Sequence, residues 1–231
     1  MALFNRGREA LVLGASGLVG RQLTEFLLED PTFSRVTLLV RRSMPIESRK
    51  LRQIEVDFEH LDEHAKRFRN QLVFICLGTT MKKAGSREAF EKVDYQYPLE
   101  AAELAAREGA RHVLVITALG SNPKSMMFYN RTKGRLEQSL SELNLPALTI
   151  FRPSLLSGPR TESRPGEEVG NLVGGMLGFA MAGPLKRYRP IEARTVARAM
   201  AIAAKDEAAS GKRVLESHEI QALANNPATS E

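Results

Sequence analysis

Short apolar runs alternate with helical patterns along most of the 231-residue chain. The runs at residues 36–40 and 112–116 are almost continuously apolar, which is typical of parallel strands buried on both faces. Between the runs, apolar residues recur at the three- and four-residue spacing of helices. Strands are expected near residues 9–14, 35–40, 53–57, 72–77, 112–117 and 147–151. Helices are expected near residues 18–29, 60–69, 86–107, 125–143 and 192–207.

This alternation predicts an α/β protein with a doubly wound parallel sheet, the Rossmann architecture. Ligands of such sheets bind beyond the carboxyl ends of the strands. The pattern breaks after residue 153, and residues 154–190 are expected to form a small C-terminal substrate lobe on a single domain spanning residues 1–231. Residues 172–184 are apolar and interrupted by glycines. They are interpreted as a buried packing helix, with a pocket lid, a dimer face or a membrane-surface contact as alternatives.

Composition excludes several classes of protein. The chain has 43% hydrophobic residues, as expected for a globular protein, and no stretch near the ~20 apolar residues that span a bilayer. The N-terminus runs into the first strand without a secretory signal, so a cytoplasmic location is expected. Cys76 is the single cysteine, which rules out an internal disulfide and a cysteine metal cluster. The net charge of +6 comes from scattered basic residues without a nucleic-acid motif, so no nucleic-acid partner is expected.

A glycine-rich turn, GASGLVG at residues 14–20, stands between the first predicted strand and the first predicted helix. A helix N-terminus presents free N–H groups and a partial positive charge, so this context indicates a phosphate site. Gly14 permits the sharp turn, Gly17 permits approach to a pyrophosphate, and Gly20 permits close helix packing. The spacing is G-x-x-G-x-x-G rather than G-x-G-x-x-G, and a plain turn with packing glycines is the alternative. The residues expected to contact a cofactor here are Gly14, Ser16, Gly17, Leu18 and Val19.

Arg41 and Arg42 end the second predicted strand, where NAD-binding sheets carry an acidic residue for the ribose 2′-hydroxyl. A guanidinium grips a 2′-phosphate instead, so the pair favours NADP(H) over NAD. A surface arginine pair is the alternative, and Arg21 is a second candidate for the same phosphate. Asp57 follows the third strand, where it could accept the adenine amino group or cap a helix.

The fourth predicted strand ends in Leu77, Gly78 and Thr79. Small residues at this place would let the cofactor ribose lie against the backbone.

Tyr129 and Lys133 are four residues apart in the helix after the fifth strand, so they share a face. An ammonium one turn from a phenol favours the phenolate, which would make Tyr129 an acid or base near neutral pH. Lys133 could also hold the nicotinamide ribose hydroxyls. A hydroxyl should polarise a substrate carbonyl, and Thr117 at the end of the fifth strand is the first choice, with Ser121 the second. A solvated helix face and an ordinary strand threonine are the alternatives.

These segments together resemble the short-chain dehydrogenase/reductase superfamily: the glycine turn, Arg41-Arg42 and Tyr129-x-x-x-Lys133. The R-P-x-x-x-x-G-P stretch from Arg152 and the IEARTVA segment at residues 191–197 resemble extended and atypical members. The likeness covers roughly residues 8–222 and is closest to the small Tat-interacting-protein-like oxidoreductases.

The resemblance implies NADP(H) and a Ser/Thr-Tyr-Lys active site. In the family the tyrosine is the acid/base, the lysine assists it and holds the ribose, and the hydroxyl orients the carbonyl; these roles fall on Tyr129, Lys133 and Thr117. The threonine departs from the serine of many relatives, and Ala118 stands where a second serine often occurs. Pro153 is expected beside the nicotinamide. The expected function is NADPH-dependent reduction of a carbonyl or similar group on an unidentified small molecule, and the alternative is an NADP(H)-binding regulatory or sensor protein without turnover.

Overall fold

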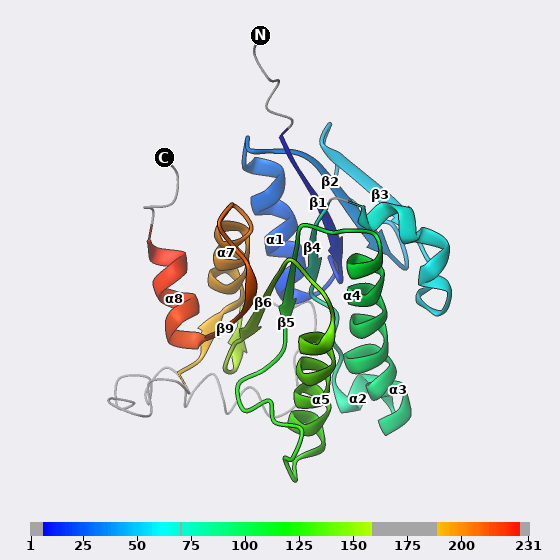
Figure 1. Cartoon of the computed structure of the whole chain (residues 1–231), viewed down its shortest axis with the longest axis vertical. Coiled ribbons are helices and arrows are strands. Elements are labelled where there is room, and N and C mark those ends of the chain that lie inside the picture. The colour runs from blue at the N-terminus through cyan, green and yellow to red at the C-terminus, as the bar shows by residue number, and fades with distance from the viewer. Residues whose placement is uncertain (1–6, 70, 159–188, 227–231) are drawn as a thin grey trace.

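The computed structural model describes residues 7–69, 71–158 and 189–226, and every structural statement below concerns these residues. Seven parallel strands form the main sheet, with helices on both faces (Figure 1). In chain order the strands of this sheet are β1 (Arg8–Leu13), β2 (Phe33–Val40), β3 (Leu51–Glu55), β4 (Leu72–Ile75), β5 (His112–Ile116), β6 (Ala147–Arg152) and β9 (Gly211–Glu216).

Helical segments connect these strands. The long predicted helix near residues 86–107 is a continuous run of α-helix, π-helix and α-helix, and the predicted helix near residues 60–69 is a 3₁₀-helix. The segments are α1 (Leu18–Glu29), η1 (Phe58–Phe68), α2 (Met81–Ala84), α3 (Arg87–Glu91), η2 (Lys92–Gln96), α4 (Tyr97–Arg107), α5 (Phe128–Glu142), α7 (Ala193–Ala203) and α8 (Ser217–Asn225).

The strand order is β3-β2-β1-β4-β5-β6-β9, which confirms the doubly wound parallel sheet. The chain winds outward from β1 in both directions, so β1 and β4 are neighbours where the winding reverses. In open α/β sheets the ligand crevice lies outside the carboxyl ends of the strands at this switch point. Most of the predicted substrate lobe, including residues 172–184, lies outside the described residues. At its edges β7 (Leu156–Ser157) pairs with β8 (Ile191–Glu192).

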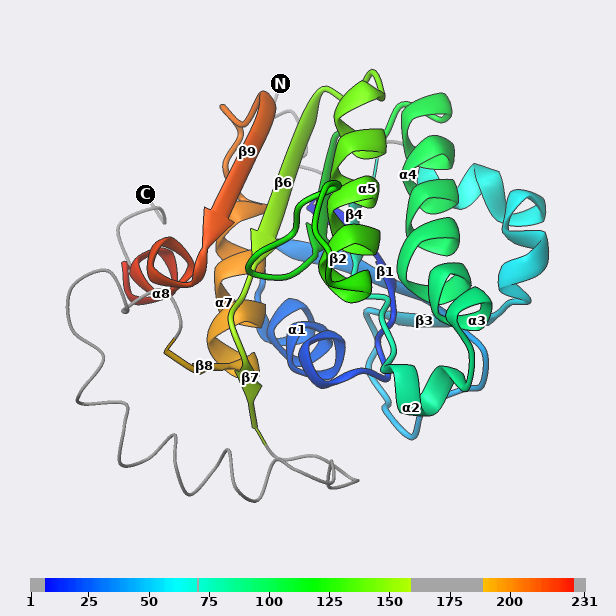
Figure 2. The same cartoon turned by 90° about the horizontal axis from the view of Figure 1, so that it is seen from below.

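Strand β1 shows how the sheet separates two hydrophobic cores. Ala10 and Val12 point into a core with α1, α7 and α8, whereas Leu11 and Leu13 point into a core with η1, α4 and α5. Successive strand side chains face opposite sides, so an unbroken apolar run buries both faces. Figure 2 shows α1 and α7 on one side of the sheet and α4 and α5 on the other.

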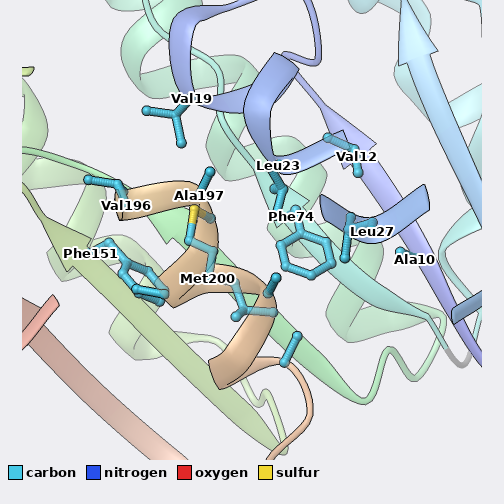
Figure 3. Close-up of a cluster of buried hydrophobic side chains, with 14 of the residues drawn as sticks. Ala10, Val12, Val19, Leu23, Leu27, Phe74, Phe151, Val196, Ala197 and Met200 are labelled. Carbon is cyan, nitrogen blue, oxygen red and sulfur yellow. The ribbon is translucent and has the colours of Figure 1, made fainter. Parts of the chain in front are cut away.

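The first core joins helices that are far apart in sequence. Leu23 and Leu27 of α1 meet Val196, Ala197 and Met200 of α7 over the sheet (Figure 3). All five side chains are fully buried. The packing of α7 therefore fixes α1, and with it the glycine turn at the start of α1. No described helix is both long enough and apolar enough to cross a membrane.

Candidate active site

The glycine turn packs backbone against backbone at the switch point. Gly14 has a φ of +82°, and a Cβ there would lie 2.5 Å from the carbonyl oxygen of Cys76, just after β4. A Cβ on Gly20 would lie 2.2 Å from the carbonyl oxygen of Gly14. No side chain fits at either place, so β1, β4 and α1 approach closely only because both residues are glycine.

Burial raises the pKa of the Cys76 thiol to about 12, so this thiol stays protonated at neutral pH.

The N-terminus of α1 is open to an anion. Gly17 is the N-cap residue and supplies no side-chain hydrogen bond, and the first turn holds no acidic residue. Ser16 and Gly17 are both exposed. The first-turn N–H groups and the helix dipole are thus available to a negatively charged group. These residues fit the pyrophosphate of a dinucleotide.

Arg41 and Asp57 lie around one tyrosine at the carboxyl ends of β2 and β3. Burial, the hydroxyl's bond to Glu59 and the charges of Glu59 and Asp57 raise the pKa of Tyr97, and the charge of Arg41 opposes that rise. Asp57 caps η1, since its carboxylate accepts from the backbone N–H of Glu59 at 3.0 Å. Arg41 and the neighbouring Arg42 are exposed. Two exposed guanidinium groups therefore follow the carboxyl end of β2.

Lys133 is held in a buried ion pair. Its ammonium lies 2.8 Å from the carboxylate of Asp94 in η2, and the two side chains are 3% and 1% exposed. The other Asp94 oxygen accepts from the backbone N–H of Thr79 at 2.7 Å. A Cβ on Gly78 would lie 3.4 Å from Asp94 and 4.0 Å from the Lys133 nitrogen. The structure thus brings Lys133 and the loop after β4 together, with Asp94 joining them.

Asp94 was not predicted as a site residue. Its sequence signal is its position: Phe90, Pro98 and Ala101 are buried neighbours on the helical run, and Asp94 falls on the same buried face. A carboxylate at an inward-facing helical position needs a partner, because an unpaired buried charge is costly. Here the partner is Lys133.

Tyr129 lies at the surface one helical turn before Lys133. Its side chain is 38% exposed, and its ring packs on Phe90 with centroids 5.8 Å apart. Within the described part of the chain its hydroxyl has no hydrogen-bond partner. The phenol is therefore accessible, while the ammonium below it is buried.

The two candidate hydroxyl donors are already engaged. Thr117 donates to the Glu137 carboxylate at 2.6 Å, and that carboxylate also pairs with Arg152. Ser121 donates to the carbonyl of Ala118 at 2.7 Å. A buried carboxylate needs hydrogen-bond donors, and the Thr117 hydroxyl is directed toward Glu137 to supply one. The structure therefore places Thr117 in a network with Glu137 and the half-buried Arg152, and among the described residues Thr117 has no hydrogen bond to Tyr129.

Pro153 follows β6 and is buried, and its carbonyl accepts from the backbone N–H of Leu119 at 2.8 Å. This bond ties the loop after β6 to the loop after β5. Among the described residues no group of three His, Cys, Asp or Glu side chains could hold a metal ion.

A parallel sheet of this order, with an open helix start at its switch point and a tyrosine–lysine pair, defines a dinucleotide-binding Rossmann protein. The chain belongs to the NAD(P)H-binding family, whose model matches residues 14–178. It is 40% identical over 166 residues to Protein HTATIP2 of Rattus norvegicus, covering 70% of this chain and 68% of that protein. The predicted likeness to Tat-interacting-protein-like oxidoreductases is confirmed.

A second relative is Protein FMP52-1, mitochondrial, of Scheffersomyces stipitis, 33% identical over 181 residues that cover 76% of this chain and 78% of that protein. Its name places that relative in mitochondria, so the predicted cytoplasmic location of this chain is not confirmed. Among solved structures, MoeE5 in complex with UDP-glucose and NAD matches with a TM-score of 0.68 and 18% identity, covering 94% of this chain and 80% of that one. This match supports the Rossmann fold.

Proposed function

We propose that the protein is an NADPH-dependent reductase that acts on a carbonyl or similar group of a small molecule. The observation that carries the proposal is the pairing of an accessible, unbonded Tyr129 hydroxyl with a buried Lys133 one helical turn away. An acid/base must reach its substrate, and the accessible Tyr129 phenol meets that requirement. In this proposal residues 154–190 form the substrate lobe.

A bound NADPH would supply the hydride. The N-terminus of α1 would hold the pyrophosphate, and Arg41 and Arg42 would hold the 2′-phosphate. Lys133 has N–H groups beyond the one that faces Asp94, and these would bind the nicotinamide ribose. Tyr129 would donate a proton to the oxygen of the reduced group.

A second candidate is an NADP(H)-binding sensor without turnover. It is favoured by one observation: the hydroxyls of Thr117 and Ser121 both donate to protein oxygens. A reductase of this kind needs a donor that polarises the substrate carbonyl, so one of these hydroxyls would have to change partner when substrate binds. A sensor needs no such change.

The substitution Tyr129→Phe tests the acid/base role. It should abolish NADPH oxidation with a panel of aldehydes and ketones while leaving NADPH binding unchanged in a fluorescence titration, because only the proton donor is removed. Tyr95→Phe is the matched control, since it also removes a phenol hydroxyl, but one that is already bonded to Ser139 at 3.1 Å. Equal turnover in wild type and Tyr129→Phe would refute the role of Tyr129. Binding of NADPH without oxidation by any carbonyl would favour the sensor.

Cofactor choice is tested by titrating NADPH and NADH. Replacing both Arg41 and Arg42 with Gln should weaken NADPH binding about tenfold or more, given the strength of charge-assisted hydrogen bonds, and leave NADH binding unchanged. Arg49→Gln, an exposed arginine further along the same loop, is the control. A wild-type preference for NADH would overturn the assignment of NADP(H).

A further inference from the structure

Two arginines from different helices lie over one aromatic ring. The guanidinium carbons of Arg87 in α3 and Arg131 in α5 are 5.2 Å and 5.8 Å from the centroid of the Phe128 ring. Each contact attracts the cation to the ring, but the two like charges repel one another. Two positive charges from different helices therefore lie against the same ring.

No carboxylate of the described residues pairs with either guanidinium. Arg131 is fixed by hydrogen bonds from one nitrogen to the carbonyls of Ser125 and Met126, at 2.8 Å and 3.1 Å, which are neutral partners. Arg135, one turn further along α5, differs because it pairs with Glu91 at 2.8 Å. Among the described residues neither Arg87 nor Arg131 forms a salt bridge, although the charge of Arg87 helps to lower the pKa of its chain neighbour Glu88. Arg131 is held in place with other N–H groups to spare.

The pair lies next to the proposed acid/base. Phe90 is buried, and its ring contacts both Phe128 and Tyr129, with centroids 5.6 Å and 5.8 Å apart. The rings of Phe128 and Tyr129 therefore both pack on Phe90, so a group held over Phe128 lies close to Tyr129. Met127, which precedes Phe128, is 65% exposed and offers an apolar surface beside the pair.

We propose that Arg87 and Arg131 form an oxyanion subsite beside Tyr129, which takes a carboxylate or phosphate group of the substrate. The subsite rests on the proposed function, because it assigns to the reductase a carbonyl substrate that carries an acidic group. Guanidinium groups bind oxyanions through two parallel N–H···O bonds, and two such groups can share one anion. The shared anion offsets the repulsion between the arginines.

The test is a binding measurement that needs no turnover. Fluorine NMR of the full-length protein with saturating NADP⁺ would follow three probes: 4-fluorobenzoate, 4-fluorophenyl phosphate and the neutral 4-fluorobenzamide. Wild type should bind at least one of the two anions more tightly than the amide. Arg87→Gln with Arg131→Gln should weaken that anion about tenfold and leave the amide unchanged. Arg135→Gln is the matched control and should bind like wild type.

Arg131 also hydrogen-bonds to the loop before α5, so its replacement removes those bonds as well. The Arg87 guanidinium contacts only the Phe128 ring in this way, so Arg87→Gln alone tests the subsite and should weaken anion binding severalfold. The comparison of benzoate with phenyl phosphate identifies which oxyanion the subsite takes. Equal binding of anion and amide to wild type, or an anion affinity that survives the double substitution, would overturn the subsite. If anion binding depends on both arginines while no carbonyl is reduced, the subsite stands and the reductase proposal fails.

Discussion

The ion pair between Asp94 and Lys133 places two charges in the protein interior at the candidate site. Its geometry is favourable, with a 2.8 Å contact and a further bond from the backbone of Thr79 to the carboxylate. A buried pair of this kind contributes little net stability compared with an apolar pair, but the loss of one partner is costly because it leaves a buried charge alone. The pair therefore makes the position of Lys133 depend on Asp94.

Replacing Asp94 with Ala should lower the free energy of unfolding by about 3–5 kcal/mol, because the Lys133 ammonium would remain buried without a counter-charge. The double variant with Asp94→Ala and Lys133→Met should recover a large part of that loss, since no buried charge remains. Urea unfolding of wild type, both single variants and the double variant measures the coupling. Simple additivity of the two single losses would show that the pair does not act as a unit.

At the scale of single residues, the sequence predicts candidates from their spacing along a helix, but it does not predict the partners that tertiary packing brings to them. Tyr129 and Lys133 follow from a four-residue spacing on a helix. Asp94 is 39 positions from Lys133 along the chain, and only the packing of α5 against η2 brings them together. The sequence also could not predict the partner of the Thr117 hydroxyl, because Glu137 lies on α5 and meets Thr117 only when the helix packs on the sheet.

Helix α5 is fixed in position by a glycine in its middle. A Cβ on Gly134 would lie 2.2 Å from the carbonyl carbon of Asn122 and 2.3 Å from the nitrogen of Pro123. The loop after β5 thus crosses α5 at its narrowest point, one residue after Lys133. The contact sets the distance between the helix that carries Tyr129 and the loop that carries Ser121.

The substitution Gly134→Ala should destabilise the protein by about 1–3 kcal/mol, because the loop backbone must move to admit the methyl group. Helix propensity alone predicts the opposite sign, since alanine is favoured over glycine in a helix interior by about 1 kcal/mol. Chemical denaturation decides between these effects, with the exposed Gln138→Ala on the same helix as the control. A gain in stability in Gly134→Ala would show that the loop gives way freely.

Periodicity predicted the elements that are buried on a full face, and it missed those at the edge. Helix α1 has the predicted bounds, because its apolar stripe and glycine start are both explicit. Strand β9 was not predicted, since its sequence GKRVLE begins with three exposed residues and lies at the edge of the sheet. The π-helical turn η2 also escaped prediction, because its residues have ordinary helical spacing.

For the whole molecule, the alternation of apolar runs and helical patterns was enough to predict the parallel sheet. A parallel sheet brings the carboxyl ends of its strands to one edge, so residues after β1, β2, β4 and β5 meet without further information. The pattern of apolar residues does not show which way each polar side chain at this edge points. The carboxyl edge could be predicted, whereas the hydrogen bonds made there could not.

The stability of the whole fold should depend on pH through His112. This residue starts the interior strand β5, is 3% exposed, and bonds through its ring nitrogen to Thr149 of β6 at 2.9 Å. Burial lowers the pKa of His112 from 6.5 to about 4, with the charge of Asp206 acting weakly in the opposite direction. His112 therefore binds a proton near pH 6.5 in the unfolded chain, but only near pH 4 in the folded protein. The stability contributed by the neutral histidine is complete above pH 6.5 and is lost as the pH falls toward 4.

Between pH 7.5 and 4.5 this single group should remove about 2–3 kcal/mol from the free energy of unfolding. Urea unfolding across that range measures the loss in wild type and in His112→Gln, which retains a hydrogen-bonding side chain but cannot take up the proton. The difference in stability between the two should change by that amount over the range, while carboxylates, which both proteins share, cancel. His60→Gln, an exposed histidine, should follow wild type throughout. Parallel pH profiles for wild type and His112→Gln would contradict the prediction, because they would show that protonation of His112 does not destabilise the folded protein.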